Sequence, residues 1–169
     1  MVEQRKWNVT FLVDSPSVHK VVVLRRAADK SYAPNLCTGI GGKLEPGENS
    51  LDSAYRELEE EAAITKNDIQ LSEFARCIYD NGLTLYYFWG ILNRSPLPTS
   101  ADGTLYWVST DKLLEQDFIP TTRSVCEEWA KRNFRVDKPF TVFVHQTGQE
   151  KGIRLFDVQR VTDGLANPN

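Results

Sequence analysis

The chain has 169 residues, enough to bury the core of one ordinary globular domain, so we expect a single domain over residues 1–169. Its composition, with 41% hydrophobic and 25% charged residues, is normal for a soluble protein. The formal net charge is −3 and no block of Lys or Arg occurs, which argues against a nucleic-acid partner because duplex-binding proteins usually carry a basic patch.

The cysteines and the hydrophobic pattern restrict the cellular setting. Cys37, Cys77 and Cys126 are odd in number and form no CxxC pair, which argues against a disulfide scaffold or a zinc site. No stretch of about 18 apolar residues occurs, and the polar segment 1–7 does not resemble a secretory signal. We therefore expect a cytoplasmic protein with no membrane partner, whose oligomeric state the sequence leaves open.

Segments that favour strands and helices follow one another without strict alternation. Stretches rich in β-formers predict strands at 7–13, 20–24, 69–79, 84–92, 105–108, 141–145 and 153–161. Asp80-Asn81-Gly82 indicates a hairpin between the third and the fourth of these strands. Helices are predicted from Asn49 or Ser50 to about Ala63, and over 121–132. This order predicts an α+β fold, an α/β/α sandwich around a mixed central sheet.

The first predicted helix carries a cluster of glutamates. Glu57, Glu60 and Glu61 are spaced i, i+3 and i+4, which brings them into one arc beside an apolar stripe that begins at Leu51. Like charges at this spacing repel, so a partner should offset them. Grouped carboxylates suit Mg²⁺, which takes carboxylate ligands together with substrate phosphates. The alternative is a solvated acidic helix face on a plain structural domain.

A glycine-rich segment precedes this helix. Gly41-Gly42-Lys43 can bring backbone groups and one ammonium close to a phosphate. The segment is not a P-loop, because Cys37 stands where that motif needs a glycine and Leu44 replaces its Ser or Thr.

The whole segment from Gly42 to Ile64 resembles the Nudix box, G-x5-E-x7-R-E-U-x-E-E-x-G-U, where U is a bulky aliphatic residue. Every specified position matches except Ala63, which replaces a glycine that ends the helix and turns the chain. An alanine there costs up to about 1 kcal/mol if its backbone is left-handed. The resemblance implies the Nudix α/β/α sandwich over most of the chain.

The resemblance also implies a Mg²⁺-dependent hydrolase, with Mn²⁺ as a substitute, that cuts a phosphoanhydride bond in a nucleoside diphosphate linked to a group X. The catalytic residues would be Glu57, which orients or deprotonates the attacking water, with Arg56 and Glu60. The metal ligands would be the Gly41 carbonyl, Glu57, Glu60, Glu61 and Asp102. Arg56 would pair with Glu48, outside the metal shell, and fix the glutamates. For Asp102, a plain turn residue before Gly103 is the alternative.

Outside the box, the sequence is most similar to MutT-like nucleoside triphosphate pyrophosphohydrolases that remove oxidised purine nucleotides. The segment 38–43 resembles their NGFGGK, with Thr38 in place of the asparagine that reads the base. Threonines at 121–122 replace two acids, which makes a preference for 8-oxoguanine doubtful. We expect a nucleoside triphosphate substrate, modified or oxidised, that gives a nucleoside monophosphate and pyrophosphate. The expected substrate-binding residues are Arg25, Arg26, Thr38, Gly42, Lys43, Phe118, Ile119 and Thr121.

Two other functions stay open at this point. One is hydrolysis of a different nucleoside diphosphate derivative, such as ADP-ribose or a dinucleoside polyphosphate. The other is a non-catalytic, nucleotide-binding regulatory module with the Nudix fold, which would typically have lost box glutamates, and none is lost here.

Overall fold

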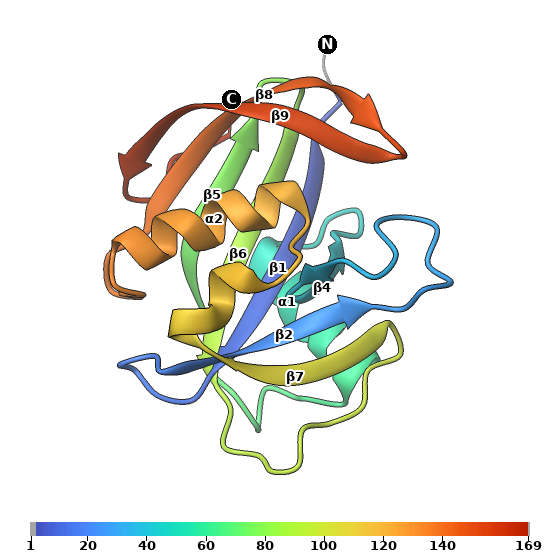
Figure 1. Cartoon of the computed structure of the whole chain (residues 1–169), viewed down its shortest axis with the longest axis vertical. Helices are drawn as coiled ribbons and strands as arrows, with labels where there is room; N and C mark the ends of the chain where they lie inside the picture. The colour runs from blue at the N-terminus through green and yellow to red at the C-terminus, as the bar shows by residue number, and fades with distance from the viewer. Residues whose placement is uncertain (1–2, 169) are drawn as a thin grey trace.

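The computed structural model describes residues 3–168, which form one mixed sheet with a helix on each of its faces (Figure 1). The elements in chain order are β1 (Arg5–Val13), β2 (Lys20–Arg26), β3 (Cys37–Thr38), β4 (Ile40–Lys43), α1 (Ser50–Ala62), β5 (Ser72–Tyr79), β6 (Leu83–Ile91), β7 (Gly103–Ser109), the 3₁₀ helix η1 (Thr110–Glu115), α2 (Pro120–Lys131), β8 (Phe140–Glu150) and β9 (Ile153–Asp163). Within these residues, neither helix is long and apolar enough to cross a membrane.

Strand β1 is central to the sheet and pairs with three others. It runs parallel to β6 and antiparallel to β2 and β4. Residues 7–10 of β1 pair with β4, and residues 12–13 pair with β2. Strands β4 and β2 therefore lie one after the other along the same edge of β1. On the other side, β6 continues into β5, β8 and β9. The arrangement brings the glycine-rich β4 and the helix after it to the middle of the sheet.

Side chains alternate between the two faces of the sheet and form two hydrophobic cores. On one face Phe11 and Phe74 pack with Trp129 of α2. On the other face Leu12 packs with Leu58 of α1. The predicted α/β/α sandwich with a mixed sheet is therefore confirmed.

Several local predictions need correction. The short strands β3 and β4 were not predicted, because they are too short and too rich in glycine to show a β pattern, and η1 was also missed. Leu51 does not belong to the buried stripe of α1, since 39% of it is exposed, and the helix packs through Ala54, Leu58 and Ala62 instead. The C-terminal strands are longer than expected and turn tightly at Lys151 and Gly152, both with positive φ.

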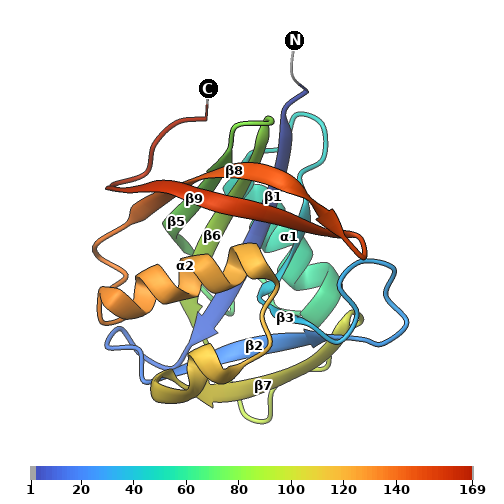
Figure 2. The ribbon, with the colours of Figure 1, turned by 45° about the horizontal axis from the view of Figure 1, so that its top comes forward.

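The β8–β9 hairpin reaches across the sheet to the loop between β2 and β3 (Figure 2). At its tip, the guanidinium carbon of Arg154 lies 5.7 Å from the centroid of the Tyr32 ring in that loop. Segments more than a hundred residues apart in the sequence thereby meet beside β4.

Candidate active site

Helix α1 has well-defined ends that fix its glutamates against the sheet. At the start, the Asn49 side chain accepts a hydrogen bond of 2.8 Å from the Asp52 amide, as an N-cap does. At the end, Ala63 has a left-handed backbone with φ of 53°, as its place in the motif led us to expect. Its amide donates to the carbonyl of Glu59, and the Ile64 amide donates to that of Leu58, so the last turn is closed without glycine.

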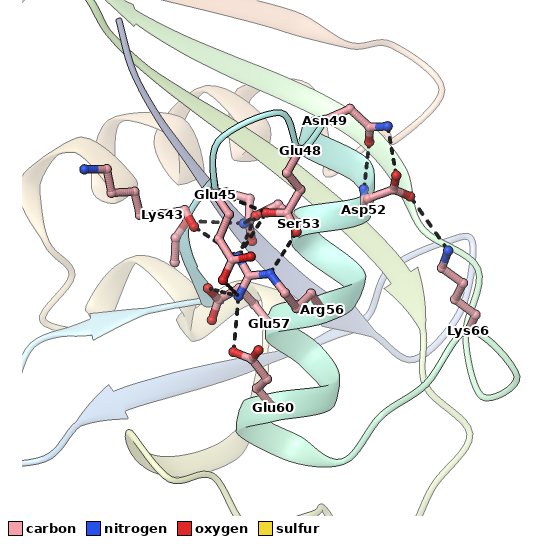
Figure 3. A network of polar contacts seen from close by, with 12 residues as sticks. Lys43, Glu45, Glu48, Asn49, Asp52, Ser53, Arg56, Glu57, Glu60 and Lys66 are labelled. Atoms are coloured by element: carbon pink, nitrogen blue, oxygen red, sulfur yellow. Dashed lines mark hydrogen bonds and ion pairs between the residues drawn. The ribbon is translucent and has the colours of Figure 1, made fainter. Parts of the chain in front are cut away.

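Arg56 is the centre of a polar network on this helix (Figure 3). Its Nε and Nη2 atoms donate to the two carboxylate oxygens of Glu48 at 2.8 and 3.0 Å, a bidentate pair. Its Nη1 atom donates to Glu57 at 3.1 Å and to Glu60 at 3.2 Å, and Nη2 also donates to the carbonyl of Lys43 at 3.1 Å. The hydrogen bond from Arg56 holds the pKa of Glu48 down at about 2. One guanidinium thus ties the loop before the helix to two of its glutamates.

Asn8 of strand β1 is buried between α1 and β4 and is hydrogen-bonded to both. Its Nδ2 atom donates to Ser53 Oγ of α1 at 2.7 Å and to the carbonyl of Gly42 in β4 at 3.2 Å. A Cβ at Gly42 would clash with Oε1 of Glu57, so a larger residue at this position would displace that carboxylate. The Glu57 carboxylate therefore lies directly against the backbone of β4.

A cluster of three carboxyl groups lies beside this contact. The Glu61 carboxyl is within hydrogen-bonding reach of those of Asp102 and Glu57. Burial, and then these neighbouring carboxyls, raise the pKa of Glu61 well above its usual range. Asp102 also forms an ion pair with Lys30. Three acidic groups from two separate segments therefore lie close together, and a bound cation would offset their mutual repulsion.

The carboxyl cluster fits a hard divalent cation. Oε2 of Glu61 is buried and receives no hydrogen bond from any donor within residues 3–168, so an acceptor is left without a partner. In the same range, no three Asp, Glu, His or Cys side chains have their ligand atoms close enough together to hold a metal ion as they stand. A bound cation would therefore need the Glu57, Glu61 and Asp102 side chains to turn toward it.

A cavity of about 370 Å³ opens beside the cluster. Gly41, Gly42 and Asp102 line it on the side of the carboxyls, and Arg26 lies at the same cavity. Ile119 and the N-terminal residues of α2 line it on the side of the other helix. The volume falls in the range of small-molecule binding sites, and the carboxyls lie at one side of it.

The polar groups on the α2 side of the cavity are mainly hydroxyls that already have partners. Thr121 Oγ1 is hydrogen-bonded to the hydroxyl of Tyr79, and Thr122 Oγ1 to that of Tyr87 at 3.3 Å. Thr38 also lines the cavity, and its hydroxyl makes no hydrogen bond within the described residues.

Comparison with known proteins decides the family. The family model described as the NUDIX domain matches residues 4–158, which is most of the chain. The chain belongs to the Nudix family. The protein is therefore a Nudix hydrolase. Nudix hydrolases act on small nucleotide substrates and generally use divalent metal ions.

Individual relatives agree with this assignment. Over 108 residues, 63% of this chain and 83% of the relative, the sequence is 31% identical to the 8-oxo-dGTP diphosphatase of Escherichia coli. An uncharacterised Nudix hydrolase of Yersinia pestis is 26% identical over 144 residues, 80% of this chain and 77% of the relative. Among solved structures, the MutT protein of Bacillus halodurans has a TM-score of 0.62 at 20% identity, covering 94% of this chain and 97% of that one.

With the Nudix fold in place, the expected substrate residues separate into two groups. Arg26 lines the cavity, but its neighbour Arg25 points to the other side of the strand, with its guanidinium carbon 6.0 Å from the Tyr106 ring. Phe118 is likewise outside the cavity, because it packs in the α2-side core against Phe11. The Lys43 side chain is exposed and points away from the carboxylates, so only its carbonyl joins the network (Figure 3).

The Nudix glutamates also differ in their surroundings. Glu57 and Glu61 lie in the carboxyl cluster, whereas the Glu60 side chain is 58% exposed and its described partner is Arg56. Asp102 lies next to Glu61, and its role as a metal ligand stays a prediction.

Several residues at the site were not predicted from the sequence, among them three charged or aromatic ones. Lys30 pairs with Asp102, and Tyr32 and Arg154 line the cavity. The first two lie in a loop without periodicity, and Arg154 lies in a polar hairpin. No local pattern distinguishes these residues from surface residues, because only the tertiary fold brings them to the cavity.

Proposed function

We propose that this Nudix hydrolase cuts a phosphoanhydride bond of a nucleoside triphosphate, ordinary or oxidised, to give a nucleoside monophosphate and pyrophosphate. In this proposal Mg²⁺ is held by Glu57, Glu61 and Asp102 with the Gly41 carbonyl, and Mn²⁺ can replace it. The observation that carries the proposal is the three-carboxyl cluster at the side of a cavity of about 370 Å³.

Each residue of the network has a task in this reaction. The bound cation would neutralise charge on the phosphates as the bond breaks. Glu57, held by Arg56 and packed against Gly42, orients the attacking water and accepts its proton. Glu60, whose exposed carboxylate accepts a hydrogen bond from Arg56, adds a ligand for the metal or for its waters. Arg26, at the end of β2 and in the lining of the cavity, would contact the phosphate chain.

The base is proposed to lie between Thr38, Ile119 and Thr121. Because the Thr121 hydroxyl is already bonded to Tyr79, it is not free to reject a wrong base. The E. coli relative is named for 8-oxo-dGTP, and its similarity supports an oxidised purine among the substrates. The threonines support a pocket that accepts ordinary purines as well.

Turnover of a nucleotide panel tests this proposal. We expect 8-oxo-dGTP, dGTP and dATP to be hydrolysed with Mg²⁺ and not with EDTA, with kcat/KM values that differ by less than about 100-fold. Ion-exchange chromatography should show monophosphate and pyrophosphate as products. A preference of about 10⁴-fold or more for 8-oxo-dGTP would contradict the permissive pocket, and one for ADP-ribose would contradict the triphosphate substrate. No turnover of any nucleotide would indicate a binding module.

Three free, buried cysteines also support the proposal of a cytoplasmic location, where thiols stay reduced.

A further inference from the structure

The β8–β9 hairpin brings a charged side chain to the cavity that the carboxylate helix does not use. Arg154, near the start of β9, lines the same cavity as Gly41 and Thr121. Its guanidinium lies beside the Tyr32 ring and, within residues 3–168, makes no hydrogen bond and no ion pair. All of its N–H donors are therefore available to a ligand.

The Tyr32 ring is itself held in place, which limits where the Arg154 guanidinium can lie. Nε of Arg26 donates to the carbonyl of Tyr32 at 2.9 Å, and the guanidinium carbon of Arg26 is 5.9 Å from the ring centroid. The ring thus has a guanidinium from β2 and another from β9 near it. Stacking on an aromatic ring orients the planar fork of Arg154 and leaves its edge free.

Arg154 lies on the α2 side of the cavity. Phe156, two residues along β9 from Arg154 and on the same face of the strand, has its ring centroid 6.0 Å from that of Tyr79. Tyr79 and Arg154 also line the same cavity. Tyr79 in turn is hydrogen-bonded to Thr121 at the start of α2. The carboxyls of Glu61 and Asp102 belong to the other side. A nucleotide in this cavity with its phosphates at those carboxyls would extend its base toward Arg154.

The hydrogen-bonding groups on the α2 side differ in whether they are free to bind a ligand and in how selectively they can do so. The hydroxyls of Thr121 and Thr122 are engaged by tyrosines, and that of Thr38 is free within the described residues. A hydroxyl can donate or accept, so it selects weakly, whereas a guanidinium only donates and presents two parallel N–H groups. Arg154 is therefore the group on this side that can discriminate between bases.

We propose that Arg154 reads the nucleobase, and that the preferred base is a 6-oxopurine, guanine or hypoxanthine, whose O6 and N7 atoms accept both N–H groups of its fork. Adenine carries an amino donor beside N7, and 8-oxoguanine carries a hydrogen on N7, so neither offers this pair of acceptors. Tyr32 acts as a positioning residue for Arg154. The inference rests on the proposed function for the place of the phosphates and deepens it by naming the base.

Steady-state kinetics on dGTP, dITP, dATP and 8-oxo-dGTP test the proposal in the wild type and in Arg154→Lys. Lysine keeps the charge but loses the planar fork. We expect the wild type to favour dGTP and dITP over dATP by about 10- to 100-fold, the range of one bidentate contact. Arg154→Lys should reduce kcat/KM for these two and leave dATP nearly unchanged.

Arg160→Lys is the matched control. Arg160 is also on β9, with its guanidinium carbon 4.0 Å from the Phe143 ring centroid, but it does not line this cavity. It should keep the wild-type ratios. If Arg154→Lys retains the ratio of dGTP to dATP, or lowers all four substrates equally as a phosphate contact would, the inference is wrong.

Calorimetric binding of dGMP and dAMP separates this inference from the proposed function, because it needs no turnover. Tighter binding of dGMP that is lost in Arg154→Lys supports the base contact even if no triphosphate is hydrolysed. Equal binding of the two nucleotides, or no binding of either, overturns the inference whatever the enzyme hydrolyses.

Discussion

At the scale of single residues, Arg56 has more partners than any other side chain of the site. It holds Glu48 through two hydrogen bonds and contacts Glu57 and Glu60 with a third nitrogen. Arg56→Lys keeps the charge but can serve only one of these carboxylates well. We expect kcat to fall by about 10- to 100-fold, as for other residues that orient metal ligands, with little change in Tm. A loss of Tm as large as the loss of activity would show that Arg56 is mainly a structural ion-pair residue.

A second residue-scale prediction concerns His145, which lies outside the site and forms an ion pair with Asp80. This hydrogen bond raises the pKa of His145 above its ordinary 6.5. The pair therefore stabilises the fold fully below pH 6.5, and the contribution is lost as pH rises through the higher folded-state pKa.

An NMR titration of His145 measures this effect directly. Asp80→Asn should return the His145 pKa toward 6.5, whereas Asp157→Asn, which removes a weaker influence, should change it less. An unchanged titration in Asp80→Asn would mean that the pair does not form in solution.

The residues of the motif were predictable because their roles are encoded by spacing along one helix. The pairing of Arg56 with Glu48 was expected and is present. Arg25 and Arg26 could not be separated from the sequence, since the alternation of the strand decides which of them faces the cavity. Arg154 was missed because its place depends on a hairpin folding back over a distant loop.

At the scale of elements, the C-terminal end of α1 carries a measurable strain. Ala63 has a left-handed backbone with φ of 53°, which is unfavourable for a residue with a Cβ. Ala63→Gly should raise the free energy of unfolding by about 1 kcal/mol, measured by urea denaturation.

Ala62→Gly provides the control for that substitution. Ala62 is the last residue of the helix and is buried, so glycine should lower the free energy of unfolding there by about 0.5–1 kcal/mol or more. If both glycines destabilise the protein, the strain at Ala63 is relieved in solution.

Some helices and strands were predictable from the sequence, and others were not. Helix α1 was predictable from its cap and its periodicity, and the β5–β6 hairpin from Asn-Gly. Strands β3 and β4 were not, because they are stabilised by pairing with β2 and β1 rather than by their own side chains.

At the scale of the whole molecule, the sheet gathers the carboxyls from separate parts of the chain. Glu57 and Glu61 come from α1, and Asp102 comes from the turn just before β7. Since β7 pairs with β2, and β2 and β4 share one edge of β1, the turn is carried to the helix by the sheet itself. The layers were predictable from the sequence, but this convergence depends on strand order, which local patterns do not contain.

Binding of Mn²⁺, measured by electron paramagnetic resonance alongside pyrophosphate release, tests most directly whether this convergence makes a catalytic metal site. Glu61→Gln removes a buried carboxyl of the cluster that can ionise as it binds a cation, and Glu59→Gln removes an exposed carboxyl from the same helix as the control. We expect Glu61→Gln to weaken Mn²⁺ binding at least about 10-fold, with a parallel loss of turnover, because affinity follows the charge of the ligands. Glu59→Gln should behave as the wild type. Equal Mn²⁺ affinity and equal turnover in all three proteins would contradict the account.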